Sequence, residues 1–169
     1  MGFPRRLKNI NSYVDGEGFL GVIAEFEEPK LAIATDDWRG GGMVGPIKVD
    51  NGLEAMQASI TMGGHELRLF RKFGIASADG VRVRLVGAYQ ADDGTAPQAV
   101  EVYIGGRFSE IDPGKGKAGD GTEHKYTVPL VYYRRVVDGI VEIEIDMIAG
   151  VFIVDGFDRY AEIMAILTS

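Results

Sequence analysis

The sequence contains no cysteine, and this absence excludes several kinds of site at once. Disulfide frameworks, cysteine nucleophiles and zinc sites built from thiolates all need the missing residue. No stretch approaches roughly 18 apolar residues without a charge, and the basic start of the chain is not followed by the apolar run of a signal peptide. We therefore expect a chain that folds in a reducing cytoplasm and has no membrane partner.

Positive charge is also scarce. The 18 lysines and arginines are outnumbered by 25 aspartates and glutamates, which gives a formal net charge of −7. Proteins that bind nucleic acids obtain most of their affinity from lysine and arginine on phosphates. The composition therefore argues against a conventional nucleic-acid binder, and it suits a surface to which DNA does not adhere.

Glycine, by contrast, is abundant, with 24 among 169 residues, about twice ordinary usage. The glycines do not follow the three-residue period of collagen, so they indicate many turns and bends. The length fits one globular domain with a substantial core. We expect residues 1–169 to form that single domain.

Alternation of apolar and polar residues predicts that most of the chain is β-strand. In the clearest case, Val81, Val83 and Leu85 alternate with Arg82 and Arg84. The expected strands are Leu7–Val14, Phe19–Phe26, Leu31–Trp38, Ile47–Val49, Leu53–Met62, Val81–Leu85, Val100–Ile111, Glu123–Val137, Val141–Asp146 and Val151–Val154.

Breaks within these strands predict irregularities. Gly105-Gly106 indicates a bulge or bend, and Pro129 indicates an edge position or a bulge. The segment Leu53–Met62 also fits a helical spacing, although the strand is favoured. Turns are expected at Asp15-Gly16, Asp50-Asn51-Gly52 and Asp138-Gly139.

Two helices are expected in this mainly antiparallel β chain. The internal one, His65–Phe73, has Glu66 in its first turn and Gly74 as its stop. Asp155 is the candidate N-cap of a C-terminal helix. One face of that helix would carry Phe157, Tyr160, Met164 and Leu167.

Two short motifs resemble signatures of ligand-binding sites, but the residues around them do not match what those signatures require. Gly114–Gly119 spells G-x-G-x-x-G, yet a strand pattern follows it, whereas the dinucleotide motif leads into a helix. His65-Glu66 starts like H-E-x-x-H, but the second histidine is replaced by Leu69, and His124 lies in another strand. We expect no catalytic residue, no metal site and no cofactor, so the chain is not expected to be an enzyme.

Two further stretches are candidates for function. Gly40–Gly42 interrupts a charged and aromatic lead-in, and such a run implies positive φ, close backbone approach or a hinge that orders against a partner. Glu142, Glu144 and Asp146 alternate with apolar residues and present a row of carboxylates to water or to a channel. The ordinary explanation of that row is a solvated sheet face.

Several short segments of the sequence occur in the same order in a known protein family. They are PRRLKN, DDWRGGGMVGPIKVDNGLEAM, FRKFG, GVRVRLVGAY, EIDPGKGKAG, VYYRRVVDG, EIEID and VDGFDRYAEI. On these segments the chain resembles the FII-type major tail tube protein of contractile-tailed bacteriophages, which is related to the tube subunit of R-type pyocins. The resemblance covers nearly the whole chain and carries no catalytic signature.

The resemblance implies an antiparallel β-sandwich or barrel-like tube subunit with a flanking internal helix and a short C-terminal helix. It implies hexameric rings that stack into a hollow conduit for DNA and the tape measure protein, with DNA passing through the lumen without specific binding. Further implied partners are the tail sheath, baseplate and tail terminator proteins. The protein would be made in the host bacterial cytoplasm and end in the virion.

The same resemblance suggests which residues meet other subunits. Candidates for contacts between protomers or rings are Trp38, Arg39, Gly40, Gly41, Gly42, Met43 and Pro46. Candidates for the lumen are Glu142, Glu144 and Asp146. Two alternatives stay open: a tube subunit of a DNA-free pyocin-like particle or type VI secretion system, and a monomeric β-barrel that binds a ligand in its interior.

Overall fold

The chain is built almost entirely of β-strands. The computed structural model describes residues 1–169 and contains thirteen strands and two short helices. The strands are β1 (Arg6–Val14), β2 (Glu17–Gly18), β3 (Ile23–Glu27), β4 (Ile33–Trp38), β5 (Ile47–Leu53), β6 (Met56–Met62), β7 (Val81–Gln90), β8 (Gln98–Gly106), β9 (Glu110–Asp112), β10 (His124–Val137), β11 (Ile140–Asp146), β12 (Val151–Val154) and β13 (Phe157–Asp158). The helices are α1 (Leu67–Phe70) and α2 (Ala161–Leu167), and neither has the length and apolar content that a membrane span requires. The expected antiparallel β fold with one internal and one C-terminal helix is confirmed.

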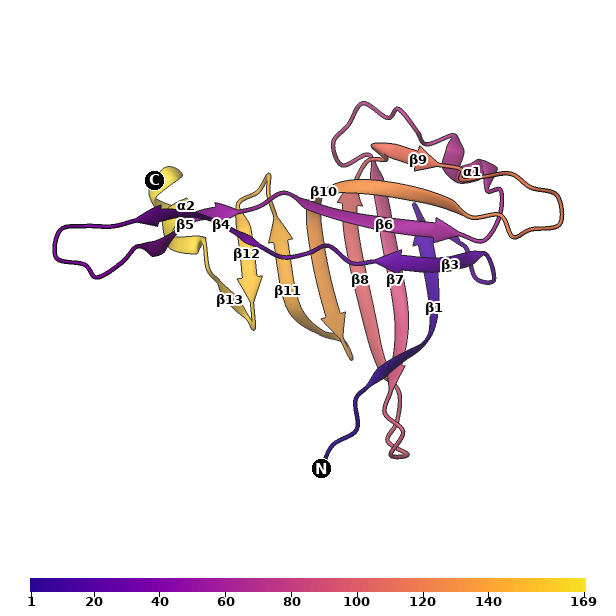
Figure 1. Cartoon of the computed structure of the whole chain (residues 1–169), viewed down its shortest axis with the longest axis horizontal. Helices are drawn as coiled ribbons and strands as arrows, with labels where there is room; N and C mark the ends of the chain where they lie inside the picture. Colours follow the sequence, from indigo (N-terminus) through magenta and orange to yellow (C-terminus); the bar gives the residue numbers. More distant parts are fainter.

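The strands form two layers that share one strand. The large sheet has the order β13-β12-β11-β10-β8-β7-β1-β2, with antiparallel neighbours throughout. The second layer contains β3, β6, β9 and part of β10, and Figure 1 shows its strands crossing those of the large sheet. Residues 124–130 of β10 pair with β6, and residues 130–137 pair with β8. One strand therefore links the layers covalently.

The strand β10 changes layers at a corner where two backbones nearly touch. The register between β10 and β8 shifts between Leu130 and Tyr132, which leaves an extra residue in β10. A Cβ atom on Gly106 would lie 2.2 Å from the carbonyl oxygen of Pro129, so only glycine fits. The bulge expected at Gly105-Gly106 is therefore found in the strand opposite, directly after Pro129.

The core lies between the two layers. It contains 19 buried apolar residues, which include Leu69 of α1 and the large side chains of Phe19, Ile60 and Tyr126. Burial of one such side chain stabilises the fold by about 1.5–3 kcal/mol. The other face of the large sheet has no layer packed against it, and we call it the open face. Cross-strand pairing assigns to the open face Asn11, Tyr13, Arg82, Arg84, Glu101, Tyr103, Tyr132, Arg134, Glu144 and Asp146.

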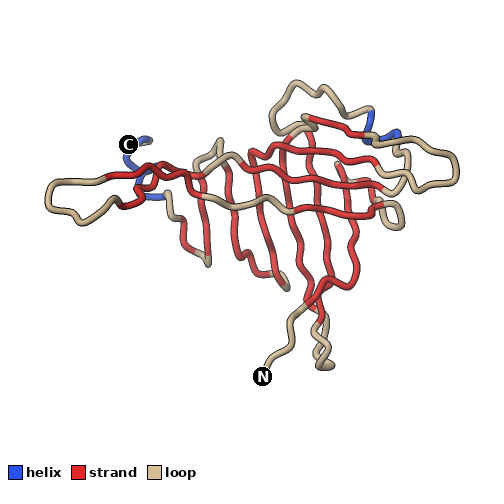
Figure 2. The backbone as a smooth tube through the Cα atoms, in the orientation of Figure 1, coloured by secondary structure: helices blue, strands red, loops and turns tan.

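The β4–β5 hairpin projects from the body of the subunit. Figures 1 and 2 show it extending past the last strands of the large sheet, with α2 beside it and the hairpin tip, Arg39–Pro46, at the far end. The turn expected at Asp50-Asn51-Gly52 is wrong, because these residues lie within β5 at a shift of register. Gly52 has a φ of 92°, and its N–H donates to Asp50 Oδ1 at 2.7 Å. The residues thus form a bulge, and the strand continues to Leu53.

The internal helix is shorter than expected. The prediction covers His65–Phe73, but the helix spans Leu67–Phe70 only. The N–H groups of Lys72 and Phe73 bond to carbonyl oxygens three residues earlier, which tightens the chain into turns beyond the helix. Gly74, with a φ of 89°, then ends the segment where the sequence places its stop.

The segment expected as one strand at Phe19–Phe26 contains a change of layer. After the Asp15-Gly16 turn, β2 pairs with β1 over only two residues. Phe19 is then buried, and its carbonyl oxygen accepts the N–H of Val22 at 3.1 Å in a turn. The chain continues as β3 in the second layer, where the hydrophobic anchor at Phe19 has redirected it.

The C-terminal helix begins later than expected. Asp155 does not cap it, because Asp155 and Gly156 have φ values of 52° and 79° and form the turn between β12 and β13. The helix α2 follows Tyr160, which provides no side-chain cap. An Asp-Gly pair favours a hairpin turn over a helix start, and here that preference decides the structure.

Candidate assembly surfaces

The hairpin tip contains most of the residues expected at a subunit contact. Met43 folds back across it: the N–H of Gly40 lies 3.0 Å from Met43 Sδ, and the N–H of Met43 lies 3.3 Å from the carbonyl oxygen of Gly40. Trp38, at the end of β4, is 60% exposed. Gly42 has a φ of 83°, whereas a Cβ atom on Gly41 would meet nothing within 4 Å. The tip is ordered by its own contacts, and its binding to another subunit stays a prediction.

The hairpin and α2 expose apolar side chains to water. No residue of α2 is buried, and Ile166 and Leu167 are largely exposed. On the hairpin, Ile33 and Ile47 are about half exposed. An isolated two-stranded hairpin is only marginally stable in water, and exposed apolar patches of this kind mark interaction sites. These elements have the character of surfaces that another chain covers.

The whole subunit has a large surface for its mass. It exposes 10741 Å² at 18.3 kDa, whereas a compact monomer of that mass exposes about 8,100 Å². A standard protein interface takes about 800 Å² from each partner. The difference of about 2,600 Å² therefore corresponds to about three such patches.

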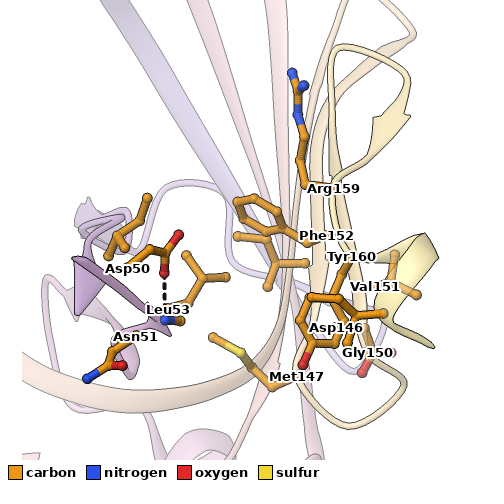
Figure 3. Close-up of a pocket in the computed structure, with 14 residues that line it drawn as sticks. Asp50, Asn51, Leu53, Asp146, Met147, Gly150, Val151, Phe152, Arg159 and Tyr160 are labelled. Atoms are coloured by element: carbon orange, nitrogen blue, oxygen red, sulfur yellow. Dashed lines mark hydrogen bonds between the residues drawn. The ribbon is translucent and has the colours of Figure 1, made fainter. Parts of the chain in front are cut away.

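A groove of about 680 Å³ separates the hairpin base from α2. Figure 3 shows Leu53 on the hairpin side, with Phe152 and Tyr160 on the other. The nearby carboxylate of Asp146 is engaged, because it accepts two backbone N–H groups of the turn that follows β11. The groove lies between surface elements and outside the filled core, so it differs from the enclosed interior of a ligand-binding barrel.

The lateral edges of the large sheet are unpaired within the subunit. One edge consists of β1 with the two-residue β2, and the other consists of β12 with the two-residue β13. Short edge strands limit uncontrolled pairing, yet their free N–H and C=O groups are a template for another strand. Joining these edges between subunits is one way to remove them.

The strand β11 carries the three acids expected in a channel. Glu144 and Asp146 lie on the open face, opposite Arg134 and Tyr132 of β10. Glu142 is exposed but lies where the register between β10 and β11 shifts, so it departs from the regular alternation. Whether this face borders a channel stays a prediction.

A row of arginine and tyrosine side chains crosses the open face beside these acids. Tyr13, Arg84, Tyr103 and Arg134 are successive cross-strand partners on β1, β7, β8 and β10, and Glu144 continues the row on β11. The guanidinium of Arg134 lies 4.3 Å from the ring centroid of Tyr103, and that of Arg84 lies 5.2 Å from the ring of Tyr13. These distances are typical of cation–π contacts. Sequence reasoning missed the row, because alternation along β7 gives a face but not the register between strands.

Glu101 connects the members of this row. Its carboxylate accepts hydrogen bonds from the Tyr103 hydroxyl at 2.5 Å and from Arg84 Nη2 at 3.1 Å. The Tyr103 hydroxyl, Arg84 and then the charge of Arg134 hold the pKa of Glu101 below its usual value, although burial acts in the opposite direction. The same carboxylate raises the pKa of Arg84. Arg84 is thus paired with a carboxylate within the subunit, whereas Arg134 contacts the ring of Tyr103 and its buried Nε has no hydrogen-bond partner.

The sequence matches the family described as phage tail tube protein FII over residues 4–167. The chain belongs to this family. The tail tube protein of Escherichia phage P2 is 38% identical over 162 residues, which cover 94% of each chain. The major tail tube protein of Serratia phage KSP20 is 37% identical over 164 residues, which cover 96% of this chain and 94% of that protein.

Membership of the tail tube family confirms several expectations. Tail tube proteins are structural components of the virion, so this tube subunit is a virion protein and not an enzyme. The resemblance to the tail tube family that the sequence segments indicate is therefore confirmed, and the matched residues include Arg39 to Pro46.

Solved structures of extracellular contractile injection systems share the tube fold. A chain of the PVC sheath/tube terminator in its extended state has a TM-score of 0.57 at 12% identity, covering 80% of this chain and 97% of that one. A chain of the extended PVC sheath-tube complex gives 0.57 at 12% identity, with 80% and 91% covered. A chain of the anti-feeding prophage baseplate gives 0.53 at 12% identity, with 75% and 90% covered. At this identity the likeness shows the fold.

Proposed function

We propose that the chain, acting as a single domain of residues 1–169, forms hexameric rings that stack into the hollow inner tube of a contractile phage tail. The tube is a conduit for DNA and the tape measure protein. The observation that carries this proposal is the large sheet, which has two unpaired edges and one face without a covering layer. Family membership and the large exposed surface support it.

The distribution of mass across the large sheet favours an inward orientation of the open face. The second layer and α1 pack against one side of the sheet only. When such subunits join edge to edge in a ring, the bulkier side needs the larger circumference and faces outward. The open face then lines the bore, and it brings Glu144 and Asp146 with it, while Glu142 lies at the bulge beside them.

The hairpin and α2 are the proposed contacts between subunits. The hairpin continues past β12 and β13 on the side of the second layer, so its tip, with Trp38, Arg39, Gly40, Gly41, Gly42, Met43 and Pro46, reaches beyond the subunit (Figure 1). A neighbouring subunit at that edge would cover the apolar side chains of both elements. The outer layer would then meet the sheath, and the ends of the tube would meet the terminator and baseplate proteins, in line with the sheath, terminator and baseplate assemblies that contain chains of this fold.

Electron microscopy of the purified protein tests the proposal. Negatively stained samples at high concentration, with and without isolated tail initiation complexes, are expected to show rings and tubes, and class averages of end views give the number of subunits. The proposal fails if the sample contains only monomers under both conditions.

A second candidate function is a tube subunit of a DNA-free injection particle. The solved structures that share the fold come from extracellular contractile injection systems, which favours this alternative. Isolation of the native particle separates the two. A capsid with packaged DNA supports the phage tail, and a tail without either supports the DNA-free particle.

A further inference from the structure

The open face carries three arginines, and each has an acidic or aromatic partner within the subunit. Arg82 Nη2 lies 3.3 Å from Asp79, and Arg84 Nη2 lies 3.1 Å from Glu101. Arg134 stacks on Tyr103 and lies opposite Glu144 in the register of β10 and β11. The face is therefore rich in guanidinium groups, although none is left facing solvent without a partner.

Unpaired arginine on this face would oppose the proposed conduit. Guanidinium groups bind phosphate through a fork of N–H donors, and each phosphate contact adds to affinity for nucleic acid. In a tube of stacked rings every subunit would repeat such a contact along the path of the DNA. An arginine that is already bonded to a carboxylate and packed on an aromatic ring has fewer donors and less net charge to offer.

We propose that Glu101 is a positioning residue that keeps Arg84 and Arg134 away from the phosphates of nucleic acid passing over the open face. Glu101 bonds Arg84 directly, and Tyr103, which donates to Glu101, provides the ring on which Arg134 stacks. Glu144 has the corresponding place opposite Arg134 and accepts the Tyr132 hydroxyl at 3.3 Å. This inference rests on the proposed function, because only a bore-lining face meets DNA.

Duplex binding by the free subunit, in which the open face is accessible, tests the inference. The variant E101Q keeps the shape of the side chain and removes its charge. E110Q makes the same change in net charge on the exposed strand β9 of the second layer and is the matched control. A labelled 20-base-pair duplex is titrated with each protein by fluorescence anisotropy, at several salt concentrations from about 20 to 200 mM.

We expect E101Q to bind the duplex about three- to tenfold more tightly than E110Q at low salt, with a salt dependence steeper by about one phosphate contact. The triple variant E101Q/R84Q/R134Q should bind no more tightly than E110Q, because both released guanidinium groups are gone. Equal binding by E101Q and E110Q would overturn the proposal, as would tight binding that persists in E101Q/R84Q/R134Q.

Two further measurements keep this result independent of folding and assembly. Circular dichroism establishes that each variant is folded, and E144Q, on β11 directly opposite Arg134, provides the same comparison for Arg134 if E101Q is unfolded. E144Q binding no better than E110Q would then count against the proposal. Ring and tube formation are scored separately by microscopy, so failure of the tube and failure of the arginine effect give different results.

Discussion

Gly106 has no space for a side chain, because the backbone of Pro129 passes directly beside it. A Cβ atom there would lie 2.2 Å from the Pro129 carbonyl oxygen and 2.8 Å from Val128 Cγ1. We expect Gly106→Ala to lower the free energy of unfolding by about 1–3 kcal/mol, since backbone at the corner must move. Urea denaturation of the free subunit measures the change.

Gly105 provides the matched control for this substitution. A Cβ atom on Gly105 would lie 3.2 Å from Tyr132 Cβ and 3.4 Å from the end of the flexible Arg82 side chain. Both neighbours are side-chain atoms, so Gly105→Ala should be the milder change. If the two alanine variants have equal stability, the close approach at Gly106 does not constrain the corner.

The buried Tyr126 should make the stability of the fold depend on pH above pH 10. Burial, followed by the charge of Glu66, raises the pKa of Tyr126 from 10.0 to about 12. The ionised form is disfavoured in the fold but not in the unfolded chain, so the contribution is complete below pH 10 and is lost as the pH rises from 10 to about 12. We expect the wild type to lose on the order of 2 kcal/mol more than Tyr126→Phe over this window.

Urea titrations at pH 9 and pH 12 measure this difference. Tyr160→Phe is the control, because Tyr160 is 40% exposed and should leave the alkaline loss as in the wild type. Parallel loss of stability in the wild type and in Tyr126→Phe would show that Tyr126 ionises in the fold as easily as in the unfolded chain.

At the scale of elements, the hairpin tip is expected to matter for assembly and not for folding. Replacing Gly41 and Gly42 by valine should strongly reduce the yield of tubes, because the tip must fit a neighbouring subunit, and it should affect folding less. For Gly41→Val alone, the melting temperature of the free subunit should change by less than about 2 °C. Tube yield by sedimentation and melting by circular dichroism are the measurements. Gly42 adds local strain through its φ of 83°, so Gly41→Val alone is the cleaner variant.

Gly121→Val is the control for the tip, because a Cβ atom there also meets nothing within 4 Å and its φ is not in the left-handed region. It should leave both tube yield and melting unchanged. A normal tube yield from Gly41→Val would mean that the tip does not take part in contacts between subunits.

The elements also show which parts of the structure the sequence can predict. Local signals were sufficient for β7, where Val81, Val83 and Leu85 are buried and Arg82 and Arg84 are not. Local signals fail where a long-range contact determines the path of the chain. Buried Phe19, for example, redirects a predicted strand into the second layer. The bulge at Gly52 has the same sequence signal as a turn, because both use glycine with positive φ.

Of the candidate surfaces, the sequence likewise indicates one and does not indicate another. Glycine composition marked the hairpin tip, because three consecutive glycines are unusual in any strand-rich chain. The link from Arg84 through Glu101 to Arg134 depends on the register of β7, β8 and β10, which pairs residues far apart in sequence. Periodicity within one strand contains no information on that register.

At the scale of the whole molecule, the exposed surface predicts that assembly contributes much of the stability. About 2,600 Å² more surface is exposed than in a compact monomer, and α2 has no buried residue. Binding that involves only the folded state raises the melting temperature by mass action. Calorimetry of tubes and of dilute subunits should therefore show that tubes melt higher, by about 10 °C or more. Equal melting temperatures would mean that the subunit does not depend on its neighbours.

The corner in β10 has a mechanical consequence for the assembled tube. The half of β10 in the proposed wall of the bore and the half in the outer layer are one continuous backbone. In the proposed tube, a force applied to the outside by the sheath would therefore reach the wall through covalent bonds and would not depend on contacts between packed side chains. In the proposed tube, the wall and the exterior of each subunit are expected to move together, because one strand belongs to both.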